Sequence, residues 1–255
     1  MPDTNLLVLY SVEGHVARIT LNRPDRRNAL NDELIAGIKS SLHEVERDGR
    51  VRVVVISGAG KDFCSGADLS ALQKIADASV AENQDDARSL MELFLMLRGL
   101  TVPVVAAVQG RALAGGCGLA TACDLVLASS SARFGYPEVR IGFVPAMVLA
   151  ILRRNVSEKN AFSLITRGEQ ISAAEAKRIG LVNEVFSEDT FATDVDQYLE
   201  GFNETSKSAV TLTKKLLYQI DGLDLNAALE TGVDVNVIAR MTEDCKQGIA
   251  KFLKK

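Results

Sequence analysis

The feature that most constrains the fold is an arrangement that occurs twice, in which a buried strand is followed by a glycine-containing loop and the start of a helix. The apolar run VRVVVIS (51–57) precedes FCSGADL, and VVAAV (104–108) precedes ALAGGCGLA. Short, nearly continuous apolar runs are typical of strands buried on both faces. Glycines let the backbone turn sharply where such a strand ends. Strands that alternate with helices in this way predict an α/β fold.

Hydrophobic periodicity predicts the other elements. In the first half of the chain they are two strands in 7–22 around a turn at Glu13-Gly14, a helix from near Asn31 to Gly49, helical sequence up to about Leu100 and a strand at 125–128. From Ala146 the sequence is mainly helical, with a strand within 181–186. It ends with helices at 206–220 and 225–241 and a short C-terminal helix. Ser172 and Glu175 have capping-box spacing, so a helix is expected to start there and to stop at Gly180.

Composition excludes several classes of function. The net charge of −4 is spread along the chain without a basic block, so no nucleic-acid partner is expected. The four cysteines form no CxxC pair, and with only two histidines a zinc site is not expected. No run approaches the roughly 18 apolar residues of a membrane helix, and the N-terminus lacks the basic segment of a signal peptide. These features predict a cytoplasmic protein without a membrane partner.

The two glycine loops offer backbone amides at points where helices begin. The first N–H groups of a helix have no intrahelical partner, and the helix dipole adds partial positive charge there. Two such groups that converge would stabilise a developing oxyanion, although glycines after strands can also be simple turn formers. A phosphate loop is excluded, because the chain has no GxxxxGK[ST] and AGGCG does not have the spacing of GxGxxG.

FCSGADL and GRALAGGCGLATACD together resemble the paired signatures of the enoyl-CoA hydratase/isomerase (crotonase) family. LNRPDRRNALN, FGYPEVRIGFVP, ISAAEAKRIGLVNEV and GIAKFLKK follow the family's order along the chain. The resemblance implies an α/β, crotonase-like core domain of ββα superhelix turns over residues 1–200 and a helical C-terminal trimerisation region over residues 201–255. It also implies an acyl-CoA substrate, a homotrimer or dimer of trimers, and no cofactor besides the coenzyme A of the substrate.

The resemblance also assigns the catalytic groups. In this family two backbone N–H groups hold the thioester carbonyl oxygen, and by motif position they belong here to Ala67 and Gly115. The family's hydratases use two glutamates to position and activate one water. The second glutamate matches Glu138, but the first would fall at Gly118, which has no group for acid–base chemistry.

A single carboxylate leaves two reactions open. Glu138 could act alone as general acid and base for hydration, which we prefer. Alternatively it could move a proton between carbons, as in the Δ3,Δ2-enoyl-CoA isomerases that this layout resembles. In either reaction a mostly apolar pocket would raise the pKa of Glu138 towards the working pH.

Further substrate contacts follow from the resemblance. They are Arg26, Arg27, Ala29, Ser65, Asp68, Leu69, Gly118, Tyr136, Lys251 and Phe252. Arg26 and Arg27 lie at the position where members of this family bind the nucleotide part of coenzyme A. Lys251 and Phe252, near the C-terminus, can reach the ligand of a neighbouring subunit in this family. Asp68 is expected to orient its loop, and Tyr136 to be pocket wall or core. Many relatives have a glycine-rich helix start after the proline, whereas Ala146, Met147 and Val148 follow Pro145 here, so the family's substrate size is not carried over.

Two other readings remain. A Clp-type serine peptidase would need Ser65 to be activated by a histidine, yet neither His15 nor His43 lies in a suitable motif. An acyl-CoA-binding protein without activity would explain the missing glutamate, but both glycine loops and Glu138 speak against it.

Overall fold

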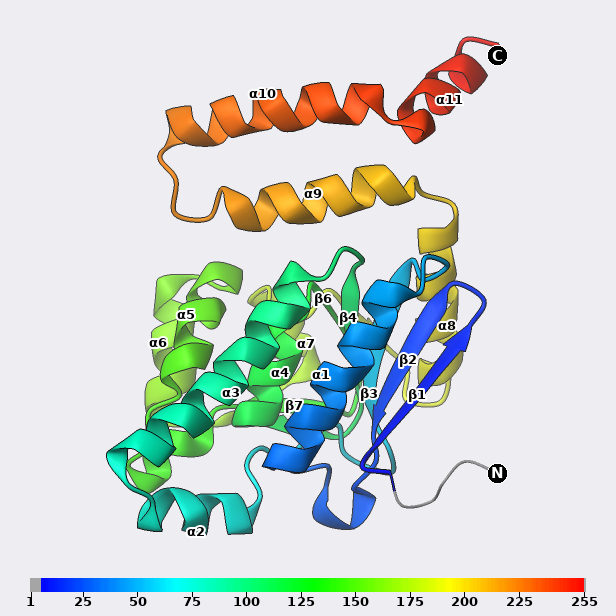
Figure 1. Cartoon of the computed structure of the whole chain (residues 1–255). Coiled ribbons are helices and arrows are strands. Elements are labelled where there is room, and N and C mark those ends of the chain that lie inside the picture. The colour runs from blue at the N-terminus through cyan, green and yellow to red at the C-terminus, as the bar shows by residue number, and fades with distance from the viewer. Residues whose placement is uncertain (1–5, 255) are drawn as a thin grey trace.

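A mostly parallel sheet of six strands forms the centre of the fold (Figure 1). The computed structural model describes residues 6–254, except for the side chain of Leu69. The strands are β1 (Val8–Glu13), β2 (Val16–Leu21), β3 (Val53–Gly58), β4 (Val104–Val108), β6 (Leu125–Ser129) and β9 (Glu184–Phe186). Their order is β1-β2-β3-β4-β6-β9, in which β1 and β2 are antiparallel and all later neighbours are parallel.

Eight helices precede the C-terminal region. They are α1 (Asp32–Arg47), α2 (Leu69–Asp77), α3 (Val80–Gly99), α4 (Gly115–Ala122), α5 (Ala146–Asn155), α6 (Glu158–Arg167), α7 (Ala173–Arg178) and α8 (Phe191–Glu200). The helical sequence expected up to Leu100 is thus two helices, because Ser79 and Glu82 form a complete capping box that starts α3. The box expected at Ser172 is half formed: its side chain caps α7, but Glu175 pairs with Arg178 instead.

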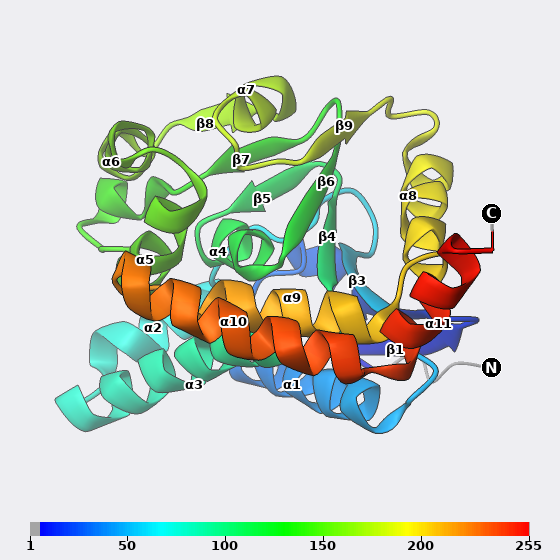
Figure 2. The same ribbon diagram turned by 90° about the horizontal axis from the view of Figure 1, so that it is seen from above.

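Apolar side chains pack against both faces of the sheet. Val54 and Ile56 of β3 belong to the main core, which includes residues of α1, α3 and α4, whereas Val53 and Val55 belong to a smaller core with residues of α8. Successive side chains of a strand point to opposite faces, so the continuous apolar run serves both cores. Figure 2 shows α8 on one side of β4 and β6, with α4 and α5 on the other.

The fold also contains a second sheet, of three strands, that the sequence pattern does not predict. It is formed by β5 (Arg111–Leu113), β7 (Arg133–Gly135) and β8 (Gln170–Ser172), with β5 and β7 parallel. Three-residue strands carry too little periodicity to be recognised, and β5 lies inside the stretch that was interpreted as a glycine loop.

The C-terminal region is helical, as expected. It contains α9 (Lys207–Gln219), α10 (Leu225–Met241) and α11 (Glu243–Phe252), and it crosses the top of the molecule in Figure 1. Short 3-10 helices, η1 (Pro24–Arg26), η2 (Pro137–Ile141) and η3 (Gly201–Asn203), complete the fold. Across residues 6–254, no helix has the length and apolar character needed to cross a membrane.

Candidate active site

The two glycine loops predicted to act together lie against each other. The amide of Cys64 donates to the Arg111 carbonyl at 3.0 Å, and the amide of Leu113 donates to the Cys64 carbonyl at 3.0 Å. Side chains would not fit at two contacts: a Cβ on Gly66 would lie 2.7 Å from the Ala114 Cβ, and a Cβ on Gly116 would lie 2.4 Å from the Cys64 carbonyl oxygen. The glycines of both motifs are therefore needed for the close approach of the loops.

The backbone around Ala67 is fixed while its own amide stays free. The Leu30 amide donates to Gly66 O at 2.7 Å, and the Asp68 amide donates to Leu30 O at 2.9 Å, so the chain is held on both sides of Ala67. Gly115 is the first residue of α4 and follows Ala114, whose φ is +50°. Within residues 6–254, neither the Ala67 nor the Gly115 amide donates a hydrogen bond. Both N–H groups are thus available to an acceptor.

Glu138 carries a buried carboxylate oxygen without a partner. The residue lies in η2 and is half-buried, and its Oε2 has no hydrogen-bond partner among the described residues. Burial raises the pKa of Glu138 above 4.5, and a hydrogen bond from its own backbone opposes this only in part. Burial likewise raises the pKa of Cys117 in α4 to about 12, and the Glu138 charge adds to that rise. Two residues before Glu138, the Tyr136 hydroxyl lies 2.7 Å from that of Thr121, which joins this segment to the helix that Gly115 begins.

The place of the family's first glutamate is filled by another helix. A Cβ on Gly118 would lie 2.5 Å from Cγ2 of Val148 in α5 and 3.4 Å from Cζ of Phe94 in α3. The same three residues are buried. A glutamate at position 118 would have to displace Val148, so the absence of that carboxylate is built into the packing of α4 on α5.

Arg23, which no sequence motif singles out, holds the loop of Ala67 in place. One of its guanidinium nitrogens donates to Asp68 Oδ2 at 2.6 Å, and the other donates to the Ala29 carbonyl. Asp68 also accepts from the Ser70 amide and so caps α2, as expected of a loop-orienting residue. The hydrogen bond from Arg23 lowers the pKa of Asp68. No local pattern in the sequence links these two residues, which are 45 positions apart.

The remaining predicted contact residues are scattered. Arg26 and Arg27 are exposed, Ala29 is buried, Ser65 is half-buried, Leu69 starts α2, and Lys251 and Phe252 are exposed on α11. Tyr136 is fully buried, with its hydroxyl 2.7 Å from that of Thr121, so it is a core residue in this chain. In Figure 1, α11 lies at the opposite end of the molecule from α2, so one chain does not bring the tail to the loop of Ala67.

The structure gives no support to a serine peptidase or a metal site. His15 Nε2 lies 3.4 Å from the Leu199 carbonyl, and His43 Nδ1 lies 3.4 Å from Glu46 Oε2. Among the described residues, neither histidine bonds to Ser65, and no group of three His, Cys, Asp or Glu side chains could hold a metal ion.

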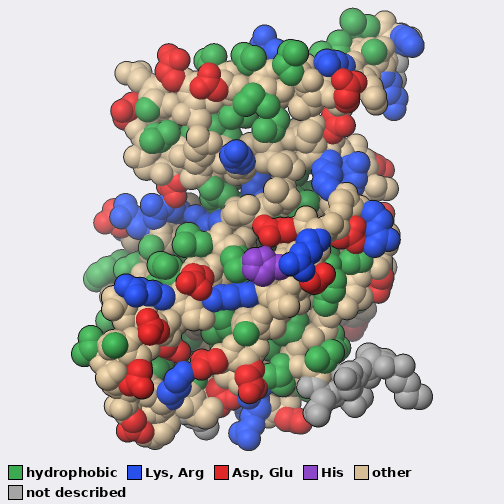
Figure 3. All heavy atoms as spheres, viewed as in Figure 1, with side chains coloured by type: hydrophobic (Ala, Val, Ile, Leu, Met, Phe, Trp, Pro, Cys, Tyr) green, Lys and Arg blue, Asp and Glu red, His purple; other side chains and the backbone are tan. Residues whose placement is uncertain are grey.

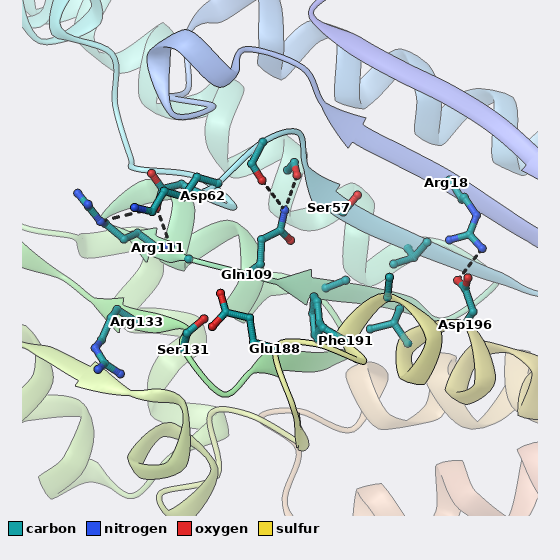
Figure 4. Close-up of a pocket in the computed structure, with 18 residues that line it drawn as sticks. Arg18, Ser57, Asp62, Gln109, Arg111, Ser131, Arg133, Glu188, Phe191 and Asp196 are labelled. Carbon is teal, nitrogen blue, oxygen red and sulfur yellow. Dashed lines mark hydrogen bonds and ion pairs between the residues drawn. The ribbon is translucent and has the colours of Figure 1, made fainter.

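A separate cavity of about 670 Å³ lies on the α8 side of the large sheet (Figure 4). Its walls include residues at the ends of β3 and β4 and in the first turns of α8. Ala67, Gly115 and Glu138 are not among its lining residues.

The comparisons agree with the fold. A protein-family model described as "Enoyl-CoA hydratase/isomerase" matches residues 11–255. The chain belongs to the enoyl-CoA hydratase/isomerase family. It is therefore an enzyme of the crotonase type, as the motifs predicted.

Members of this family match along nearly the whole chain. A "Putative enoyl-CoA hydratase" of Thermus thermophilus is 41% identical over 243 residues, which are 95% of this chain and 96% of the relative. The "2,3-dehydroadipyl-CoA hydratase" of Escherichia coli is 34% identical over 249 residues, 97% of this chain and 96% of the relative. A solved enoyl-CoA hydratase of Mycobacterium smegmatis superposes with a TM-score of 0.93 at 30% identity, covering 97% of this chain and 96% of that one.

Proposed function

We propose that this chain is an enoyl-CoA hydratase that adds water to a 2-enoyl-CoA, with Glu138 as its one acid–base carboxylate. The observation that carries the proposal is the partnerless, buried oxygen of Glu138, two residues from Tyr136, whose hydroxyl contacts Thr121 of the helix that starts at Gly115. A buried carboxyl group whose pKa is raised holds a proton more readily than an exposed one, which suits it to take up and return a proton. Several relatives are named for hydration, among them a "Crotonyl-CoA hydratase" that is 33% identical.

In the proposed reaction the free amides of Ala67 and Gly115 hold the thioester oxygen. Ionised Glu138 takes a proton from water as the water oxygen bonds to C3 of the enoyl group. The electrons of the C2–C3 double bond move towards the thioester, and the resulting enolate oxygen is stabilised by the two N–H groups. Protonated Glu138 then returns the proton to C2, so that water is added and the carboxylate is restored.

The thioester is proposed to bind through its coenzyme A part. Arg26 and Arg27 are exposed cations near the loop of Ala67 and would meet the phosphates. Lys251 and Phe252 lie far from that loop in their own chain, so we propose that they act on a neighbouring subunit's ligand.

A Δ3,Δ2-enoyl-CoA isomerase is the second candidate, and one observation favours it. Val148 fills the space at Gly118, so the wall where a second carboxylate would hold water is apolar. An isomerase needs no water there, because Glu138 would take a proton from C2 and return it to C4.

Product analysis separates these functions. Wild type and Glu138→Gln are incubated with 2-enoyl- and 3-enoyl-CoAs of several chain lengths, and the products are identified by mass. We expect water addition by the wild type and a loss of about 10²–10⁴-fold in the variant. Double-bond migration without added mass would identify an isomerase. Binding without turnover would identify an acyl-CoA-binding protein, and full activity in the variant would show that Glu138 is not the catalytic group.

A further inference from the structure

The cavity beside α8 carries chemistry that the acyl-CoA reaction does not use. It lies on the opposite side of the large sheet from α4, and Figure 4 shows its walls. Part of its wall is apolar and is formed by Val55 of β3, Ala107 of β4, and Phe191 and Val195 of α8. The polar part of the lining includes three cationic residues, Lys61, Arg111 and Arg133. A pocket of about 670 Å³ with an apolar wall and a few polar groups has the size and composition of a small-molecule site.

Three charged groups of the cavity are left without a charged partner. Arg18 pairs with Asp196 at 2.7 Å. The Arg111 Nε lies 3.6 Å from Asp62 Oδ1. In the part of the chain that the structure describes, Lys61, Arg133 and Glu188 form no ion pair, and the Arg133 guanidinium has one hydrogen bond, to the carbonyl of the adjacent Ala132. The unpaired set therefore contains both signs of charge.

The positively and negatively charged side chains lie in different parts of the cavity. In Figure 4 the guanidinium groups of Arg111 and Arg133 lie at one end of the cavity. The Glu188 carboxylate is turned to the middle, between Gln109 and Ser131, and Phe191 lies on its other side. A plain anion would meet Glu188 as a like charge, and a plain cation would meet the arginines. A ligand with a carboxylate, an ammonium group and an apolar side chain matches all three parts.

We propose that this cavity binds an α-amino acid with an aliphatic side chain. Its carboxylate would lie at Lys61 and Arg133, its ammonium group at Glu188, and its side chain against the apolar part of the wall. Charge-assisted hydrogen bonds of both signs fix such a ligand in one orientation. This site is independent of the hydratase proposal, because it uses none of the same residues.

The direct test is calorimetric binding to the purified full chain. The probes are L-leucine, 4-methylpentanoate, which lacks the ammonium group, and 3-methylbutylamine, which lacks the carboxylate. We expect L-leucine to bind and each of the other two to bind at least about tenfold more weakly, the factor that corresponds to about 1.4 kcal/mol. Equal binding of either partial ligand, or no binding of L-leucine, would overturn the proposal.

Two variants on α8 locate the binding. Ala192 lines the cavity, so Ala192→Trp should fill it and abolish binding. Thr193 is exposed on the same helix and does not line the cavity, so Thr193→Trp is the matched control and should bind as wild type does. Glu188→Gln should remove the preference for L-leucine over 4-methylpentanoate. Undiminished binding by Ala192→Trp, with an unchanged Tm, would place the ligand elsewhere and contradict the proposal.

Discussion

At the scale of the single residue, the proposed chemistry depends on a carboxyl group that the fold keeps partly out of water. Glu138 Oε2 is buried without a partner, and burial raises the pKa of the group. Buried polar atoms that lack partners cost free energy, so such an atom is retained where it serves the reaction. Residues that support a reaction in this way are expected to lower the stability of the fold.

This cost predicts a pH-dependent stability difference for Glu138→Gln. The folded pKa lies above 4.5, so the folded state binds this proton more tightly than the unfolded state. The stability contributed by the group is therefore full below about pH 4.5 and falls as the pH rises through the folded pKa. Glutamine carries no charge at any pH, so we expect the variant to have the higher Tm at pH 8, with a smaller gain at pH 4. The measurement is calorimetric Tm across this range, and an unchanged difference would contradict the burial of the charge.

Gly118 and Val148 predict a second residue-scale effect. Ala is favoured over Gly in a helix by about 1 kcal/mol, but a Cβ at position 118 would stand 2.5 Å from Val148 Cγ2. Overpacking of a core costs about 1–3 kcal/mol, so Gly118→Ala should be net destabilising. In a Val148→Ala background the clash is removed, and the same change should become neutral or stabilising. Urea unfolding of the double-mutant cycle measures this coupling.

A glycine of α10 supplies the control for that cycle. A Cβ on Gly232 would meet no atom within 4 Å, so Gly232→Ala should gain roughly 0.5–1 kcal/mol of stability. Additive effects at Gly118 and Val148 would show that α5 does not close the site.

At the scale of the element, α9 is fastened to the core by a buried cation. Lys214 donates to Leu97 O at 2.8 Å, to Val102 O at 2.9 Å and to Asp124 Oδ2 at 2.7 Å. The hydroxyl of Tyr218, one turn further on, donates to the other oxygen of Asp124 at 2.6 Å. Burial lowers the pKa of Lys214, although the Asp124 charge opposes this. The first helix of the C-terminal region is thus held by a paired and hydrogen-bonded charge rather than by apolar contact alone.

Removal of one partner should therefore be costly. We expect Lys214→Met to lower the free energy of unfolding by about 3–5 kcal/mol, because Asp124 would keep a buried charge without its cation. Lys215 is the next residue and is exposed, so Lys215→Met should change stability by less than about 0.5 kcal/mol. Denaturant unfolding of the two variants is the measurement, and similar losses in both would exclude a special role for the buried pair.

At the scale of the whole molecule, the C-terminal region leaves apolar side chains in water. A stripe at intervals of four residues follows α10: Leu225, Leu229, Val233, Val237 and Met241, each more than half exposed. Figure 3 shows hydrophobic side chains along this upper edge, and Phe252 of α11 is 77% exposed. Exposed apolar stripes of this kind are typical of surfaces that associate.

We therefore expect self-association through these helices, and the resemblance to the crotonase family implies that the assembly is a trimer or a dimer of trimers. Light scattering coupled to size exclusion should give a multiple of three times 27.4 kDa for the wild type and a smaller mass for Val233→Asp/Val237→Asp. Asn236→Asp, also exposed on α10, adds charge without removing an apolar contact and should keep the wild-type mass. A monomeric wild type would contradict this expectation, and with it the proposed action of Phe252 on a neighbouring subunit.

Several features of the fold followed from the sequence because their causes are local. The predicted bounds of β4 and α10 agree with the structure to the residue, because an apolar run and a helical period can both be recognised from neighbouring positions in the sequence. The pattern predicts the turn between β1 and β2 at Glu13-Gly14, whereas the two turn residues are Gly14 and His15, and Gly14 has a φ of +61°. The second sheet has three-residue strands whose partners lie far along the chain, so no local hydrophobic period predicts it.

The candidate active site likewise has features that follow from the sequence and features that depend on the tertiary structure. The sequence by itself determined the paired glycine loops, the family and the lack of a carboxylate at Gly118, because each is a matter of residue type at a motif position. Only the tertiary structure decided that Val148 fills the space at Gly118, that Arg23 holds Asp68, and that Glu138 Oε2 is buried without a partner. The physical reason is that burial, packing and pKa are set by groups from distant segments, and these meet only when the chain is folded.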